Sequence, residues 1–254
     1  VRRAFDKARG GSPQNYFKRL FEIFVSASSL SLQRPEMKAV KQQGAAQQTR
    51  RRIIRAAEKL FAENGFRAMT LRAVTREARV NLAAVNYHFG SKINLMRAVI
   101  EQRFEPINRE RLDWLEAAVV QHGESPVPLE TIFEALFRPL FNQMMTARGP
   151  DRLLMQMIGR ALTEPADFMR EMHREFFFEL CRRFLFELQR SCPELAEDDL
   201  QMRFFLAVST MLGTISEQTR LEVMTAGKLT GADLEGMCDA LTAYVVAGFR
   251  QGGV

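Results

Sequence analysis

The sequence has few of the residues that mark disulfide-rich, metal-binding or membrane-spanning proteins. It holds three Cys, three His and one Trp in 254 residues. Cys181, Cys192 and Cys238 are odd in number and lack zinc-ligand spacing, so we expect reduced thiols in a cytoplasmic protein. The histidines are too scattered to predict a metal centre, and no cofactor is expected. No run approaches the roughly 20 consecutive apolar residues that span a bilayer, which excludes an ordinary membrane-spanning helix.

Phenylalanine and methionine are abundant instead, and charge is unevenly distributed. The chain has 20 Phe and 13 Met, which predict a deformable apolar interior. Residues 49–98 hold 11 Lys/Arg and 3 Asp/Glu, a net charge of +8, whereas residues 99–254 hold 16 and 24, a net charge of −8. A basic segment joined to an acidic remainder fits a polyanion-binding head on a non-binding body. On charge alone, a solvated basic face is the alternative.

Residues 1–48 do not have the pattern of a folded unit, and we expect a disordered or non-native N-terminal extension. The cluster Gly10-Gly11-Ser12-Pro13 breaks regular structure, and residues 41–48 form a polar tether. A signal peptide is a weak alternative, because Glu22 interrupts the apolar run. Met37 stands just before the tether, so we expect translation to start near it and residues 1–36 to be absent from the native protein.

A helical period begins at Thr49. Ile53, Ala57 and Phe61 form a single apolar stripe, which predicts a helix over residues 49–64, and Gly65 stands where a left-handed cap is expected. Val85 and Phe89, further along, are predicted to point into the core of the same domain.

Two short helices follow with a very tight connection. Thr70 is the predicted cap of the first and Asn81 of the second, with Arg79 between them, and Ser91 caps a longer helix beyond. Two short helices joined this closely must cross steeply. This is the helix-turn-helix geometry, in which the second helix can enter a major groove.

Beyond residue 100 the pattern is helical, and no alternating run predicts a strand. Breaks delimit helices at roughly 99–120, 129–147, 151–162, 166–191, 198–224 and 232–250, and proline is expected to kink two of them at Pro106 and Pro139. The sequence therefore predicts an all-α fold. An N-terminal three-helix helix-turn-helix domain at 49–98 binds DNA, and a larger helical domain at 99–254 binds a ligand and dimerises.

The stretch Thr49–Ile100 resembles the DNA-binding domain of the TetR family of repressors. The matching residues are Ile54-x-Ala56-Ala57-x-x-Leu60-Phe61-Ala62-Glu63-x-Gly65-Phe66, Thr70-Leu71-Arg72, Ala78-Arg79-Val80-Asn81, and Val85-Asn86-Tyr87-His88-Phe89-Gly90-Ser91-Lys92. The family usually has Gly where this chain has Arg79. Arginine there either adds left-handed strain of about 1 kcal/mol or shifts the turn by one residue. The string from Asn81 to Lys92 is especially similar to PsrA-type regulators, some of which respond to fatty acids or acyl-CoA.

The DNA contacts are expected on the second helix of the motif and around it. Base edges are read by short or hydrogen-bonding side chains, and phosphates are held by helix N-termini and cations. For base reading we predict Asn81, Leu82, Ala83, Asn86 and Tyr87. For phosphate or groove contact we predict Thr70, Arg72, Ser91, Lys92, Arg50, Arg51 and Arg52. The resemblance implies DNA contact for Thr70, Tyr87, His88 and Lys92, although His88 can equally brace the domain.

The acidic body is expected to hold an apolar ligand pocket and a dimer interface. The pocket candidates are Phe137, Phe141, Met155, Ile158, Phe168, Met172, His173 and Phe176, with Arg160 as a further polar anchor. Ordinary core packing is the alternative for each apolar one. The last two helices are the dimerisation candidates, as the resemblance also implies. On the first of them small residues permit close approach, and the candidates are Phe205, Ala207, Ser209, Leu212, Gly213 and Ser216, with Phe204, Leu206 and Met211 beside them.

Together these features predict a dimeric regulator, most simply a repressor, that binds a palindromic operator in double-stranded DNA and is released by a small apolar effector. A fatty acid or an acyl-CoA is one candidate effector. A ligand-independent repressor or architectural DNA-binding protein is the alternative. An enzyme is not expected, since the sequence offers no nucleophile with its base, metal cluster or phosphate loop.

Overall fold

The computed structural model describes residues 44–146, 149–231 and 233–251, and the chain divides into two units, residues 1–52 and 53–254. In the first unit, residues 44–52 are helical, and Arg50, Arg51 and Arg52 are exposed. The N-terminal extension predicted over 1–48 lies mostly outside the described residues, and its described part, 44–48, is helical. The expectation for residues 1–36 lies wholly outside them.

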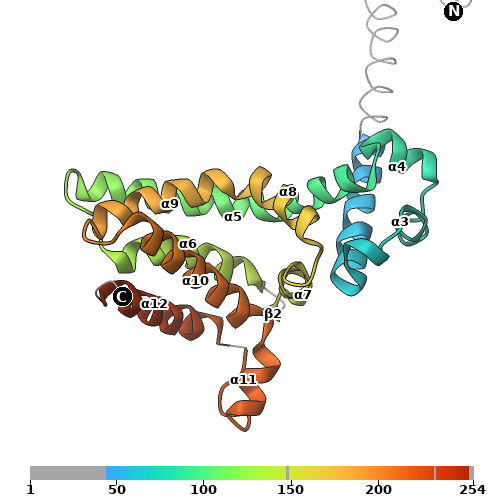
Figure 1. Cartoon of the computed structure of the whole chain (residues 1–254). Helices are drawn as coiled ribbons and strands as arrows, with labels where there is room; N and C mark the ends of the chain where they lie inside the picture. The colour runs from blue at the N-terminus through green and yellow to red at the C-terminus, as the bar shows by residue number, and fades with distance from the viewer. Residues whose placement is uncertain (1–43, 147–148, 232, 252–254) are drawn as a thin grey trace, which may run out of the picture. The chain divides into compact units, whose positions relative to one another are not determined.

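The second unit begins with the helix over residues 53–68 and the two helices of the motif. Gly65 adopts the predicted left-handed conformation, with φ 76°. The helical residues nevertheless continue to 68 rather than ending at 64, because the Met69 amide still donates to the Gly65 carbonyl at 3.1 Å. The helices α3 (Leu71–Ala78) and α4 (Leu82–Phe89) follow, as predicted from the tight connection (Figure 1).

The predicted caps hold α3 and α4 in place. The Thr70 hydroxyl accepts from the Ala73 amide at 3.1 Å, and Asn81 Oδ1 accepts from the Ala84 amide at 2.8 Å. Between them, Arg79 has φ 52° and ψ 50°, so the turn is not shifted and a non-glycine residue occupies the left-handed region. This conformation costs an L-residue about 1–2 kcal/mol. Val85 and Phe89 are buried, as predicted. They belong to one cluster, here called the head core, which runs from Ile53 to Ile100 and also includes Met157, Phe168 and Met172 of the body.

The body is built from eight further helices and one minimal hairpin among the described residues. The helices are α5 (Lys92–His122), α6 (Leu129–Met144), α7 (Arg152–Ala161), α8 (Ala166–Phe176), α9 (Phe178–Ser191), α10 (Glu197–Ser216), α11 (Gln218–Met224) and α12 (Leu234–Arg250). The strands β1 (Met145–Thr146) and β2 (Gly149–Pro150) pair antiparallel. The all-α fold class is confirmed, since the hairpin only joins α6 to α7.

Several predicted boundaries in the body are wrong. The segment expected at 99–120 is part of α5, which starts at its Ser91 cap and continues through Pro106. The helix expected at 166–191 is two helices, because Phe177, at φ −126° and ψ −15°, leaves the helical conformation. Glu217 likewise separates α10 from α11. Neither position has a glycine or proline, so no breaker residue marked these junctions. The helix expected at 129–147 ends earlier, at Met144, where β1 begins.

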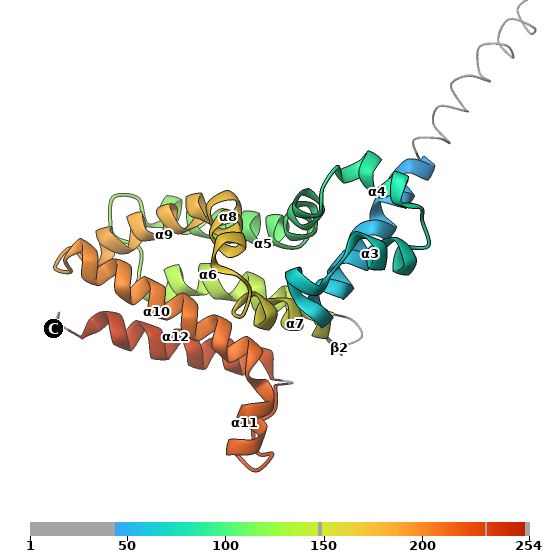
Figure 2. The ribbon, with the colours of Figure 1, turned by 45° about the vertical axis from the view of Figure 1, so that its right-hand side comes forward.

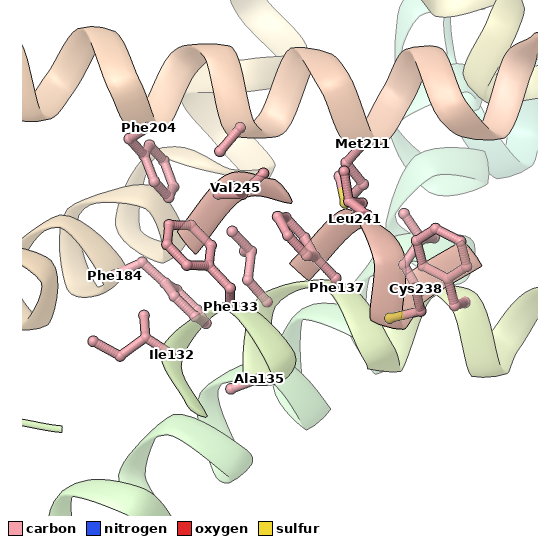
Figure 3. Close-up of a cluster of buried hydrophobic side chains, with 14 of the residues drawn as sticks. Ile132, Phe133, Ala135, Phe137, Phe184, Phe204, Met211, Cys238, Leu241 and Val245 are labelled. Carbon is pink, nitrogen blue, oxygen red and sulfur yellow. The ribbon is translucent and has the colours of Figure 1, made fainter. Parts of the chain in front are cut away.

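The body core lies where α6 packs against α5 and α12, and where α10 packs against α7, α9 and α12. Phe133, Phe137 and Phe184 are fully buried there (Figure 3). Burying a large apolar side chain stabilises a fold by about 1.5–3 kcal/mol, so this aromatic layer is a major source of the body's stability. None of the helices described is long and apolar enough to cross a membrane.

Candidate nucleic-acid interface and sensor cavity

The outward face of α4 carries the side chains predicted to read bases. Asn81, Leu82, Ala83, Asn86 and Tyr87 are all exposed, and Tyr87 is 83% accessible. The helix turns Val85 and Phe89 inward, so the exposed set forms one face. A short helix with amide, small apolar and phenolic groups on one face matches the donors, acceptors and methyl contacts that a major groove offers.

The helix caps limit which hydrogen bonds several of these polar side chains can make with DNA. Asn81 Oδ1 is engaged by the Ala84 amide, which leaves its amide N–H groups as donors toward DNA. The hydroxyl of Thr70 is engaged in the same way, and so is that of Ser91, which accepts from the Asn94 amide at 3.2 Å. Phosphate contact at these two positions would therefore come from the backbone amides at the helix start. Arg72, in the first turn of α3, is exposed beside one of these starts.

Two of the predicted contact residues are only partly exposed. The His88 ring is half-buried, with its centroid 5.2 Å from that of Tyr87. Lys92 places its ammonium 4.3 Å from the centroid of the Phe66 ring and 3.4 Å from the Arg67 carbonyl oxygen. Partial burial lowers the pKa of Lys92 from its ordinary value. Bracing is thus the role visible for Lys92, whereas the ring contacts of His88 within the described part of the chain are only with its chain neighbours, and the DNA contact of both stays a prediction.

The head is joined to the body by an aromatic stack and a set of polar links. Phe66 and Phe168 stack with centroids 4.1 Å apart and an interplanar angle of 8°. The Phe66 amide donates to Glu164 Oε1 at 2.9 Å, and Arg160 donates to the Glu63 carbonyl at 2.9 Å. Arg160 therefore holds the end of the first head helix and does not line the cavity described below, contrary to the expectation that it anchors a ligand.

A buried ion-pair relay makes a second link. Arg103 on α5 contacts both Glu58, on the head helix over 53–68, and Asp151, the cap of α7, the latter at 3.1 Å. Burial raises the pKa of Glu58 above its ordinary value despite the hydrogen bond from Arg103. Removing one partner of a buried ion pair leaves an uncompensated charge, which is costly, so these contacts tie α5 and α7 to the head helix.

An apolar cavity of about 170 Å³ lies in the body and reaches the head. Its walls come from α5 to α10 and from Phe61 on the head helix. Five of the lining residues belong to the head core: Phe61, Ile100, Met157, Phe168 and Met172. Leu162 and His173 are its exposed lining residues and mark the side nearest solvent. The cavity therefore shares wall residues with the core beneath α3 and α4.

The structure brings together half of the predicted pocket residues. Ile158, Phe168, Met172 and His173 line the cavity. The other four, Phe137, Phe141, Met155 and Phe176, are absent from its lining. Phe137 points into the core between α6 and α12 (Figure 3), and Phe141 and Met155 are buried in that same body core. Phe176 is half-buried at the end of α8. Phe137 and Phe141 are thus buried, as expected, but they do not lie on the face of α6 that lines the cavity, which carries Leu136 and Leu140.

A cavity residue that the sequence prediction missed is Arg111. Its side chain is only 3% exposed, and it lies on α5 between the buried Ile107 and Leu115. The sequence did contain a sign of this burial, because Arg111 interrupts the apolar stripe of α5 at helical spacing. Charged residues are almost never fully buried unless they are paired.

The predicted dimer residues divide between two faces of α10. Phe205 is 62% exposed, whereas Ala207 is buried and Leu212 lines the cavity. Ser209, Gly213 and Ser216 are half-buried, and the Ser216 hydroxyl donates to the Leu212 carbonyl within the helix. Leu206, expected beside Phe205, is exposed as well, and the exposed apolar residues that the prediction missed are Met202 on α10 and Tyr244 on α12. α10 and α12 pack side by side (Figure 1, Figure 2), so these residues extend the surface around Phe205.

Two protein-family models match the chain. Residues 53–99 match the model described as bacterial regulatory proteins, tetR family, and residues 134–248 match the model described as Tetracyclin repressor-like, C-terminal domain. The first match spans the helix-turn-helix, and the second spans most of the body.

Curated relatives are regulators as well. The HTH-type transcriptional regulator UidR of Escherichia coli (strain K12) is 38% identical over 114 residues, covering 39% of this chain and 58% of UidR. SrpR of Pseudomonas putida is 38% identical over 133 residues, covering 51% of this chain and 60% of SrpR. The matches therefore span less than two thirds of the length of these relatives.

Solved structures share the fold. The fatty acid degradation regulator FadR from Bacillus halodurans superposes with a TM-score of 0.54 at 16% identity, covering 80% of this chain and 97% of FadR. The SmeT–triclosan complex superposes with a TM-score of 0.53 at 19% identity, covering 81% and 96%.

Proposed function

Because this chain belongs to the TetR family of bacterial regulatory proteins, we propose that it is a repressor that binds a palindromic operator as a dimer and releases it when a small apolar effector binds. The observation that carries the proposal is the exposed face of α4. DNA binding is assigned to residues 49–98, and effector binding and dimerisation to residues 99–254. Such a protein acts in the bacterial cytoplasm, where the chromosome lies.

Base reading is assigned to the face from Asn81 to Ala83 with Asn86 and Tyr87. An Asn side chain can pair with the N6 and N7 edge of adenine, and Asn86 is exposed for this. Leu82 and Ala83 can contact thymine methyl groups. Each good contact between a side chain and a base edge discriminates against the wrong base by about 1–3 kcal/mol. One α4 alone therefore cannot supply tight specific binding.

Dimerisation through α10 and α12 provides the second half-site. Met202, Phe205 and Leu206 on α10 and Tyr244 on α12 are more than half exposed, which is a costly surface for a monomer in water. A two-fold axis through such a face is self-complementary, and it would place two α4 helices on successive major grooves. The interface is therefore centred on Phe205 and not on Ala207 or Leu212, which face the inside of their own chain.

Release by an effector is supported by the cavity and its shared wall. A molecule that fits only one arrangement of α5 to α10 shifts the population toward it. Because Phe61 and Ile100 belong to both the cavity and the head core, that shift reorients α4 and changes the half-site spacing. FadR is described as a regulator of fatty acid degradation and SmeT was solved with triclosan, so acyl compounds and small aromatic compounds are the effector classes to test here.

The deciding experiment is selection of bound fragments from a random duplex DNA pool by the full chain, followed by gel-shift titration of the recovered site. We expect a palindrome with half-sites about one helical turn apart or a multiple of it. Asn86→Ala should weaken binding by about 1–3 kcal/mol and relax the sequence preference at one position per half-site. Gln121→Ala, an exposed residue at the far end of α5, is the control and should change nothing.

Recovery of no preferred sequence would refute the proposal. A palindrome whose affinity is indifferent to every compound that binds the protein would favour the second candidate, a ligand-independent repressor or architectural protein.

A further inference from the structure

The cavity contains a positive charge that no acidic side chain among the described residues neutralises. Arg111 donates from Nε to the Leu136 carbonyl at 2.7 Å and from Nη1 to Asn108 Oδ1 at 3.1 Å, and its Nη2 lies 3.8 Å from Met211 Sδ. A guanidinium has five N–H donors, and a thioether is a weak acceptor. Three neutral acceptors therefore leave part of this donor set available.

The charge persists at neutral pH. Burial lowers the pKa of Arg111, but only to about 10, so the guanidinium remains protonated. The nearby Cys181 does not serve as a counter-ion, because burial raises the pKa of its thiol above the ordinary value in spite of Arg111. A buried cation held only by neutral acceptors, with no counter-ion among the described residues, is costly to the fold. An anion arriving from outside would recover part of that cost.

The rest of the cavity wall sets the character and size of the molecule that carries the anion. Around Arg111 the lining is apolar, with Phe104, Leu136, Phe177 and Val208 among its members. The volume of about 170 Å³ is close to that of an engineered cavity of about 150 Å³ that holds benzene. A long acyl chain would need considerably more room.

We propose that the effector is a compact apolar carboxylate, of the size of one aromatic ring, whose anionic group binds Arg111 and whose body occupies the apolar part of the cavity. The planar guanidinium can engage both carboxylate oxygens through Nη1 and Nη2, which gives the pairing geometric specificity. This inference rests on the proposed function and narrows its effector from any apolar molecule to an acid. It also connects the ligand to α5, the helix that carries both Arg111 and Ile100.

The test uses benzoate and its neutral isostere benzamide with the full chain, free of DNA, in isothermal titration calorimetry. We expect benzoate to bind at least tenfold more tightly than benzamide and to raise the Tm, whereas benzamide has little effect. Equal affinity for the two compounds would overturn the proposal, because the carboxylate would then contribute nothing. Binding of palmitoyl-CoA without binding of benzoate would also overturn it, because the size argument would then fail.

Substitutions at Arg111 separate a ligand contact from a structural role. Arg111→Met keeps an unbranched apolar side chain and should abolish the preference for acid over amide. Arg111→Lys keeps the charge and should retain the preference with weaker binding. Arg109→Met is the matched control, since Arg109 is an exposed arginine on the same helix, paired with Glu105, and should leave both affinities unchanged.

Retained acid preference in folded Arg111→Met would refute the assignment of Arg111. If Arg111→Met does not fold, wild type is compared with Arg111→Lys instead. Loss of the preference for benzoate over benzamide in Arg111→Lys, which keeps the positive charge, would contradict the argument from charge. Operator binding by the ligand-free chain is measured separately. DNA binding without benzoate binding defeats this inference alone, whereas benzoate binding without any preferred DNA sequence defeats the proposed function.

Discussion

The stack of Phe66 on Phe168 should couple the stability of the head to that of the body, and a double-mutant cycle can measure that coupling. The two rings lie with centroids 4.1 Å apart and planes 8° from parallel. Aromatic pairs in such geometry contribute about 0.5–1.5 kcal/mol beyond the area they bury. Replacing each Phe by Leu removes the ring interaction and retains most of the apolar volume.

The cycle isolates the ring–ring contribution from the other contacts of Phe66. Phe66→Leu also removes the contact with the Lys92 ammonium, worth about 0.5–1 kcal/mol at a partly exposed site. That loss occurs whether or not Phe168 is present, so it cancels in the difference that defines the coupling energy. We therefore expect Phe66→Leu and Phe168→Leu together to destabilise by about 0.5–1.5 kcal/mol less than the sum of the two single variants.

The measurement is urea denaturation of the four proteins followed by circular dichroism, at one fixed protein concentration because a dimer's stability depends on it. Phe66→Leu combined with Phe133→Leu is the control, since Phe133 lies in the body core. That pair should be additive within about 0.3–0.5 kcal/mol. A coupling energy below about 0.3 kcal/mol for the Phe66–Phe168 pair would refute the reasoning that this stack joins the two parts.

Three further outcomes are expected. Arg72→Ala should weaken DNA binding equally for all sequences and reduce the salt dependence of affinity by about one phosphate contact, and an unchanged slope in gel shifts would contradict that role. Phe205→Glu should yield monomers in sedimentation equilibrium, whereas Phe178→Glu, at a 58% exposed position on α9, should stay dimeric; equal behaviour of the two argues against the α10–α12 interface. Burial raises the pKa of Glu58 in the folded state, so the protonated side chain is favoured by folding. That contribution to the free energy of unfolding is fully present below the ordinary pKa of 4.5 and is lost as pH rises through the raised pKa. Glu58→Gln should therefore gain stability relative to wild type as the pH rises above 4.5 in urea denaturation, and a pH-independent difference would contradict this.

The head was predictable from the sequence because its structure is determined locally. Thr70, Asn81 and Ser91 cap their own helices through hydrogen bonds to amides three residues away, and such bonds depend only on nearby residues. The inward positions Val85 and Phe89 followed from helical spacing. The conformation of Arg79 was narrowed to two alternatives, and only the structure shows that the left-handed one is adopted.

The body was predicted less well because its features depend on which helices pack together. A helix buried on most of its surface, such as α6, has apolar residues on several faces, so spacing cannot tell whether Phe137 faces a cavity or the core. The break at Phe177 lacks any glycine or proline, so nothing in the local sequence marks it, although α8 and α9 both pack on other helices. Arg111 is a different case. Its position within the apolar stripe of α5 was visible in the sequence, but only the structure shows that it lines a cavity.

The wall that the cavity shares with the head core constrains how this protein can evolve. A substitution at Phe61 or Ile100 that admits a different molecule also changes the packing beneath the DNA-reading helices, so a gain in ligand range there tends to be selected against. Val208 and Phe177, which line the cavity but pack against the body core, are free of that conflict. Descendants that respond to new compounds should therefore carry their changes on α9 and α10, while the side toward the head drifts slowly.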